Sequence, residues 1–136
     1  MAVLQGCTYD PVRDTYAAQV TADLAAAKVV KVSDASYSPC LVVIGTAGCV
    51  PYGVSEAAID YSVDGGRTTV IRNGYVKMTC AAAITDCTLP VKAAASGNIT
   101  PCDTDKDVIV GYPIHTAANG DAVLIDLKLM GSFYTV

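Results

Sequence analysis

The sequence predicts a mostly β protein, a small antiparallel β-barrel or sandwich with an N-terminal arm, and three observations support this prediction. Short runs of β-branched and aliphatic residues recur from residue 29 onward. Turn-forming residues separate these runs at intervals of about 8–12 residues, which is typical of small barrels and sandwiches. Two Asn-Gly pairs, Asn73-Gly74 and Asn119-Gly120, indicate tight turns, because both central positions of such turns require a positive φ.

The first 28 residues differ from the rest, and we expect them to form an N-terminal arm in front of a compact β domain at 29–136. This segment has few turn-forming residues and is rich in alanine between residues 15 and 27. Helix propensity would allow a short helix over 20–27, although the apolar positions form no clean stripe. An arm with few ways to bury its own side chains usually relies on a neighbouring subunit.

Within the β domain, the first expected strands are two apolar runs at 29–32 and 40–44. The segment 58–63 alternates between apolar and polar residues, as a half-buried strand does. Its apolar positions are Ile59, Tyr61 and Val63. We therefore expect 58–63 to be a third strand with one buried face.

Two pairs of strands are expected in the second half of the chain. Residues 68–71 and 75–79 flank the first Asn-Gly pair and are predicted to form a β-hairpin. Residues 107–114 and 122–130 flank the second pair. In the last strand, the alternation places Val123, Ile125, Leu127 and Leu129 toward the core and Asp126 and Lys128 toward solvent.

An even number of cysteines would indicate a disulfide framework in a secreted chain, and beside it the six cysteines allow two further interpretations that the sequence leaves open. They are Cys7, Cys40, Cys49, Cys80, Cys87 and Cys102. The simpler interpretation is that they are reduced, small buried side chains, since the first residues lack the basic start and apolar run of a signal peptide. The alternative is that disulfides form late, after release from a reducing cytoplasm. Cys80 with Cys87, or Cys40 with Cys49, are close enough in sequence for such a bridge.

Charge and hydropathy narrow the range of partners. The formal net charge is −4, the sequence pI is about 4.6, and only 16% of the residues are charged, against about 25% in a typical soluble domain. No apolar run reaches the length of about 18 residues that a membrane span needs. The eight tyrosines are dispersed along the sequence, without the basic residues of a nucleic-acid platform. We therefore expect neither a nucleic acid nor a membrane as a partner.

The chain is expected to be non-enzymatic, with no catalytic, cofactor-binding or metal-ligating residues. Its one histidine, His115, lies at a strand end with no nucleophile motif nearby. The nearest cysteine pair has six residues between its members, too many for a zinc site. Residues 103–107 begin like a calcium loop, but Val108 and Ile114 occupy the positions that need Gly and Glu. A solvated acidic turn is the better interpretation of this segment.

The stretch 53–129 resembles the capsid decoration (cement) proteins of tailed bacteriophages. The resemblance depends on the hairpin sequence at 70–76 (VIRNGYV) and on a closing pattern at 108–114 (VIVGYPI) and 117–127 (AANGDAVLIDL). It implies a β-barrel-like domain that forms a homotrimer or another small homo-oligomer. Such proteins bind the major capsid protein on the outside of an icosahedral head, and the arm at 1–28 matches the attaching segment by position only.

The expected function is therefore that of a capsid decoration protein, assembled in the host cytoplasm and located on the capsid exterior of the virion. The sequence leaves two alternatives open. One is another phage structural subunit, such as a tail or fibre component. The other is a secreted, disulfide-bonded carbohydrate-binding module.

Overall fold

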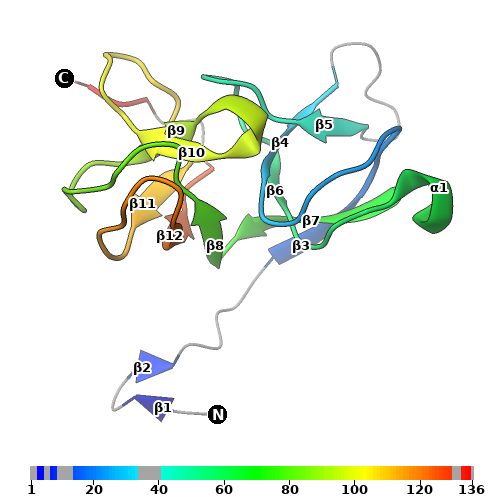
Figure 1. Cartoon of the computed structure of the whole chain (residues 1–136), viewed down its shortest axis with the longest axis horizontal. Helices are drawn as coiled ribbons and strands as arrows, with labels where there is room; N and C mark the ends of the chain where they lie inside the picture. Colours follow the sequence, from blue (N-terminus) through cyan, green and yellow to red (C-terminus); the bar gives the residue numbers. More distant parts are fainter. Residues whose placement is uncertain (1–2, 5–6, 9–13, 34–40, 130–132, 136) are drawn as a thin grey trace.

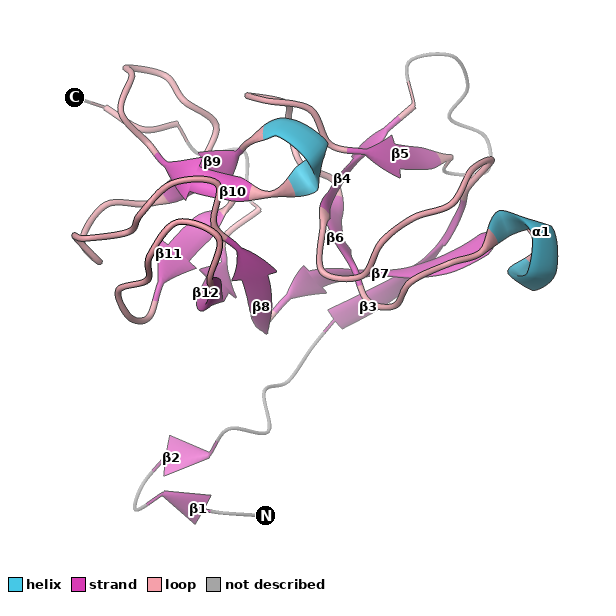
Figure 2. Cartoon of the chain, in the orientation of Figure 1, coloured by secondary structure: helices cyan, strands magenta, loops and turns pink. Residues whose placement is uncertain are grey.

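The computed structural model describes residues 3–4, 7–8, 14–33, 41–129 and 133–135, with side-chain surroundings from residue 15 onward. Two antiparallel five-stranded sheets form the body (Figure 1), and one of them curves into a half-barrel. This confirms the prediction of a mostly β fold. Within the described residues, helical structure is limited to α1 (Tyr61–Asp64) and the 3₁₀ turn η1 (Ala95–Gly97), both cyan in Figure 2.

Each sheet is built from one continuous part of the chain. The first sheet has the spatial order β3 (Asp14–Gln19), β7 (Arg67–Asn73), β6 (Gly53–Ser55), β4 (Val29–Val32) and β5 (Val42–Ile44). The second has the order β10 (Ile99–Pro101), β9 (Val91–Ala93), β11 (Gly111–Pro113), β12 (Ala122–Leu127) and β8 (Tyr75–Thr79). A separate pair, β1 (Val3–Leu4) and β2 (Cys7–Thr8), precedes both sheets.

In both sheets, the two outer strands approach each other at one end. Gln19 of β3 forms a parallel bridge with Leu41, just before β5. Cys80, just after β8, forms a parallel bridge with Ile99 of β10. Each sheet therefore curls, because a flat five-stranded sheet could not bring its first and last strands together.

Two apolar cores result from this arrangement. The larger core joins the sheets: Val29, Val54 and Ile71 of the first sheet pack with second-sheet residues such as Val123 and Ile125. The smaller core lies against the other face of the first sheet. Its buried members are Ala18, Val20, Leu24, Val30, Val42 and Val70. Successive residues of β4 and β7 thus enter different cores, as expected for strands that are buried on both faces.

The segment expected to be an arm at 1–28 is part of the body from Asp14 onward. β3 pairs with β7 along its whole length, from Asp14 opposite Asn73 to Gln19 opposite Arg67. Val20 and Leu24 are buried, and Leu24 exchanges backbone hydrogen bonds with Ile59. The short helix considered over 20–27 does not form, because tertiary pairing and burial override the weak helix propensity of alanine.

The prediction of a strand at 58–63 is wrong in part, because residues 61–64 form the single helical turn α1. Asp60 caps this turn by accepting a hydrogen bond from the Ser62 N–H, and Gly65 ends it with a φ of 73°. A helical turn that exposes Tyr61 and Val63 thus replaces the alternating strand.

The prediction of a β-hairpin around Asn73-Gly74 is also wrong. β7 and β8 are consecutive in sequence but belong to different sheets, β7 pairing with β3 and β6, and β8 with β12. Gly74, with a φ of 107°, is the point where the chain crosses from the first sheet to the second. Asn-Gly supplies the backbone conformation of a sharp turn, but it does not determine whether the flanking strands pair.

Other expectations are confirmed. The run at 29–32 is β4, and Asn119-Gly120 lies in the connection between the paired strands β11 and β12. In β12, Val123, Ile125 and Leu127 are buried, as the alternation predicts. The strand expected at 107–114 is shorter, since only Gly111–Pro113 is regular.

Candidate functional site

A groove on the first sheet is a candidate site among the described residues, because it brings a guanidinium together with aromatic and apolar side chains. It has a volume of about 430 Å³ and is open to solvent. Its lining comes from β4, from the segment between β5 and β6, and from β7, and includes Lys31, Val32, Cys49, Val50, Tyr52 and Arg72. We call this the Arg72 groove.

Two tyrosines and one carbonyl hold the Arg72 side chain. Its Nε donates a hydrogen bond of 2.9 Å to the Tyr52 carbonyl oxygen. The guanidinium carbon lies 4.5 Å from the centroid of the Tyr52 ring and 5.6 Å from that of Tyr16. These are cation–π distances, so both rings stabilise the positive charge and restrict its orientation. A guanidinium has five N–H donors, and the Nη groups remain in addition to the one that Tyr52 uses.

Gly53 makes this arrangement possible. A Cβ atom at this position would lie 2.2 Å from Val70 Cγ1, 2.8 Å from the Ile71 carbonyl oxygen and 3.3 Å from Arg72 Cγ. Any side chain at residue 53 would therefore push β6 away from β7 and displace the stem of Arg72. The glycine lets the two strands approach while Arg72 extends toward Tyr52.

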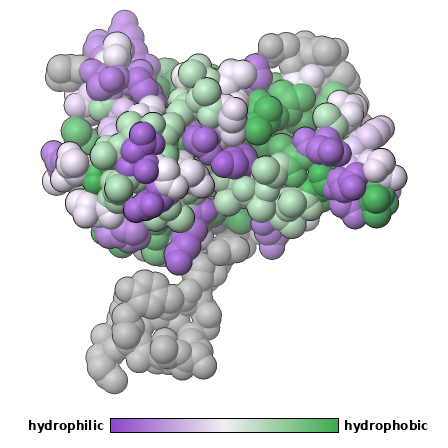
Figure 3. All heavy atoms as spheres, in the orientation of Figure 1, coloured by the Kyte–Doolittle hydropathy of each residue, from purple (hydrophilic) through white to green (hydrophobic). Residues whose placement is uncertain are grey.

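The surroundings of the groove are apolar and unusually exposed. Val50 is 68% exposed, Ile44 40% and Val32 37%. Figure 3 shows apolar side chains gathered over β5 and the adjoining part of β4. Burial raises the pKa of the Cys49 thiol, so this group stays neutral at physiological pH. The groove thus combines the guanidinium of Arg72 with neutral and apolar neighbours.

His115 has a structural position. It is exposed, its Nδ1 lies 2.9 Å from the Thr116 carbonyl oxygen, and its Nε2 accepts a 3.3 Å hydrogen bond from the Leu124 N–H. It therefore supports the connection between β11 and β12.

Across the described residues, no group of three or more His, Cys, Asp or Glu side chains is arranged to hold a metal ion.

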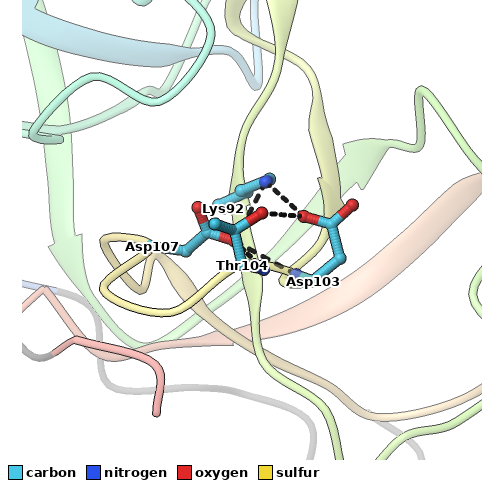
Figure 4. Close-up of polar contacts among 4 residues, drawn as sticks. All are labelled: Lys92, Asp103, Thr104 and Asp107. Atoms are coloured by element: carbon cyan, nitrogen blue, oxygen red, sulfur yellow. Dashed lines mark hydrogen bonds and ion pairs between the residues drawn. The ribbon is translucent and has the colours of Figure 1, made fainter. Parts of the chain in front are cut away.

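The acidic segment 103–107 is a hydrogen-bonded turn (Figure 4). Lys92 Nζ lies 2.7 Å from Asp103 Oδ1 and 2.9 Å from Asp107 Oδ2. Asp107 Oδ2 also accepts hydrogen bonds from the backbone N–H groups of Asp103 and Thr104. The hydrogen bond from Lys92 lowers the pKa of Asp103. Burial alone would raise the pKa of Asp107, but the hydrogen bonds from Lys92 and the backbone outweigh it and lower that pKa.

Four cysteines lie in the described region with free thiols, namely Cys49, Cys80, Cys87 and Cys102. Cys80 and Cys102 are buried, as expected for small apolar side chains, and no bridge joins Cys80 to Cys87. The pairing of Cys40 with Cys49 falls outside the described residues, as does the side chain of Cys7.

The helical segments of the described region are also too short to span a membrane.

The sequence did not reveal the Arg72 groove. Its central residues, Tyr16, Tyr52 and Arg72, are far apart in the chain, and the tyrosines are dispersed in sequence. Folding brings them together because β3 and β6 both pair with β7. No local motif carries this information, since the contact depends on sheet order.

The fold defines the chain as a two-sheet β protein. Comparison with known proteins shows that this fold is similar to that of a solved structure. No protein-family model matches the chain, and no curated protein matches it. Among solved structures, it is similar to the crystal structure of the head fibre gp8.5 N base of bacteriophage phi29. The TM-score is 0.66, the sequence identity is 14%, and the match covers 90% of this chain and 100% of the other. This likeness establishes a shared fold.

Proposed function

We propose that the protein is a structural component of a bacteriophage virion, a capsid decoration protein that binds the outside of the head. The observation that carries this proposal is the fold similarity to a phage head fibre base, which covers nearly all of both chains. The resemblance of 53–129 to phage decoration proteins agrees with it and rests on different features, the turn and strand patterns of the sequence.

The physical mechanism is preferential binding to the assembled shell. A protein that binds the mature head and not its dissociated subunits lowers the free energy of the assembled state. Contacts with more than one copy of the major capsid protein add avidity. A homotrimer or another small homo-oligomer would multiply these contacts. This role requires surface complementarity and no catalytic group.

The proposed attachment segment is residues 1–13, which is shorter than the arm expected from sequence. β1 and β2 are two-residue strands, and a hairpin of this size is not stable alone in water. In Figures 1 and 2 this pair lies apart from both sheets. Pairing with a shell protein would supply the main-chain hydrogen bonds and burial that it needs.

Co-sedimentation with heads tests both parts of the proposal. The full chain, added to heads of the source phage produced without it, should bind with a fixed stoichiometry. A variant lacking residues 1–13 should keep the β-sheet circular dichroism of the full chain, because β3 is intact, but should lose binding. Truncation to residue 28 is not a suitable test, since it removes β3 and the buried Val20 and Leu24.

The outcomes separate the two claims. Failure of the full chain to bind heads would reject the decoration role. Full binding by the truncated variant would reject the attachment segment alone.

A second candidate is the base of a longer fibre on the head, which the similarity to a head fibre base specifically favours. Cryo-electron microscopy of particles distinguishes the two functions. Density that continues from this protein outward, away from the head, would favour the fibre base over the decoration protein.

A further inference from the structure

We propose that the Arg72 groove binds a segment of a partner protein in which a carboxylate side chain stands next to an apolar one. This inference rests on the proposed function, because it assigns the groove to a protein of the head. It identifies the groove as a second contact, separate from residues 1–13.

The guanidinium of Arg72 is prepared for a carboxylate. Its Nε is bonded to the Tyr52 carbonyl, and two aromatic rings restrict it, so little conformational entropy would be lost on binding. Within the described side chains, the ion pairs join Lys92 to Asp103 and Asp107 and Lys128 to Asp126, and none of them involves Arg72. A half-buried guanidinium gains from a carboxylate that accepts two of its N–H bonds at once.

The apolar rim indicates what must accompany the carboxylate. Val50 is more exposed than any other large apolar residue of the groove. Val32, at the end of β4, is a second exposed apolar residue that lines it. Covering such side chains is favourable by about 25 cal/mol per Å² of apolar surface. Arginine and tyrosine are also the residue types that most often dominate protein–protein binding energies.

Charge favours a different protein over a second copy of this chain. The whole chain has a net charge of −4, whereas the groove presents the guanidinium of Arg72 beside the neutral thiol of Cys49. Two copies would repel each other at long range, whereas an acidic segment of a partner is attracted locally to the groove. The groove is thus complementary to an acidic, partly apolar segment of a head protein.

The test uses the full chain and the same co-sedimentation with heads. Arg72→Gln should weaken binding at least about tenfold, because it removes the charge and the forked donor. Lys77→Gln is the matched control, since Lys77 is exposed on β8 of the other sheet, and it should change affinity by less than about twofold. Raising the salt concentration should weaken the wild type more than Arg72→Gln.

A second variant keeps the test valid if Arg72→Gln perturbs folding. Val50→Asp places a negative charge on a side chain that is 68% exposed, so the fold should tolerate it while the incoming carboxylate is repelled. Its control is Val63→Asp, at a position that is 78% exposed on α1. We expect the first to weaken head binding at least about tenfold and the second to leave it unchanged.

The experiment distinguishes failure of the groove assignment from failure of the decoration role. If the wild type binds heads and both groove variants bind equally well, the groove assignment is wrong and the decoration role stands. If the wild type does not bind heads, both the decoration role and the groove assignment are wrong. If the groove variants instead shift the oligomeric state of the free protein in sedimentation velocity, the occupant is a second copy, which would overturn the assignment to a partner protein.

Discussion

Cys102 illustrates how burial determines the chemistry of single residues in this protein. Its side chain is 1% exposed. Burial, with a smaller contribution from the Asp107 carboxylate, raises the pKa of its thiol from 9.0 to about 11. Burial also raises the pKa of Cys80 and Cys49. The buried thiols of Cys80 and Cys102 and the half-buried thiol of Cys49 are therefore protonated at neutral pH, with little thiolate to react.

The raised pKa of Cys102 predicts a loss of stability at alkaline pH. An unfolded thiol ionises near pH 9 and the folded one near pH 11, so the unfolded state is favoured increasingly across this interval. About two pKa units correspond to at most about 2.7 kcal/mol. In urea unfolding between pH 7 and 10.5, Cys102→Ala should show a smaller alkaline decrease than the wild type. Cys87→Ala serves as the control, and an identical decrease in Cys102→Ala would contradict the prediction.

At the scale of elements, the turn at 103–107 depends on one carboxylate with two tasks. Asp107 pairs with Lys92 and also accepts hydrogen bonds from two backbone N–H groups. An asparagine could keep the backbone hydrogen bonds but would lose the ion pair. An alanine would lose both and would leave the N–H groups without this acceptor.

This difference predicts an order of stability. Asp107→Ala should lower the free energy of unfolding by about 2–3 kcal/mol, and Asp107→Asn by about 1 kcal/mol. Because the pKa of Asp107 is lowered, its contribution is present at neutral pH and is lost as the pH falls through that pKa. Urea unfolding at pH 7 and pH 3 should show the gap between wild type and Asp107→Ala narrowing in acid. Equal stabilities of the two variants would contradict the dual role.

The local sequence pattern predicts an element correctly where it matches the final environment of that element. The apolar run at 29–32, the alternation of Val123, Ile125 and Leu127, and the acidic turn at 103–107 were predicted correctly. It failed where long-range pairing decides the outcome. The pattern around Asn73-Gly74 cannot show that the two strands enter different sheets, and the alanine-rich segment before residue 28 gives no sign of the partners that make it a strand.

The candidate site was harder to predict than the fold. Tyr16, Tyr52 and Arg72 come from three strand regions that meet only through the order of the first sheet. Gly53, which leaves room for Arg72, is one of 11 glycines, and its spatial constraint appears only when β6 packs against β7. A sequence motif cannot encode such a site, because Tyr16, Tyr52 and Arg72 are at least 20 residues apart in the chain.

At the scale of the whole molecule, the shared core joins the two sheets into one unit. Val29, Val54 and Ile71 of the first sheet lie in the same core as β8 and β12 residues of the second. Neither sheet can therefore keep its inner face buried if the other unfolds. This arrangement favours a single cooperative unfolding transition.

Truncation of a shared-core residue tests this cooperativity. Ile71→Ala should lower the free energy of unfolding by about 2–5 kcal/mol and should keep one transition in calorimetry, because Ile71 is 2% exposed within the joint core. Val63→Ala, on the exposed turn α1, should change stability by less than about 0.5 kcal/mol. Two separate transitions in the wild type or in Ile71→Ala would show that the sheets unfold independently.

The single crossing at Gly74 also bears on the order in which the protein can be built during synthesis. All strands of the first sheet lie in residues 14–73, and all strands of the second lie in residues 75–127. The ribosome therefore delivers every strand of the first sheet before any strand of the second. Until the later residues follow, the inner face with Val29, Val54 and Ile71 has no cover, so the nascent chain carries an apolar surface for the time needed to translate its second half.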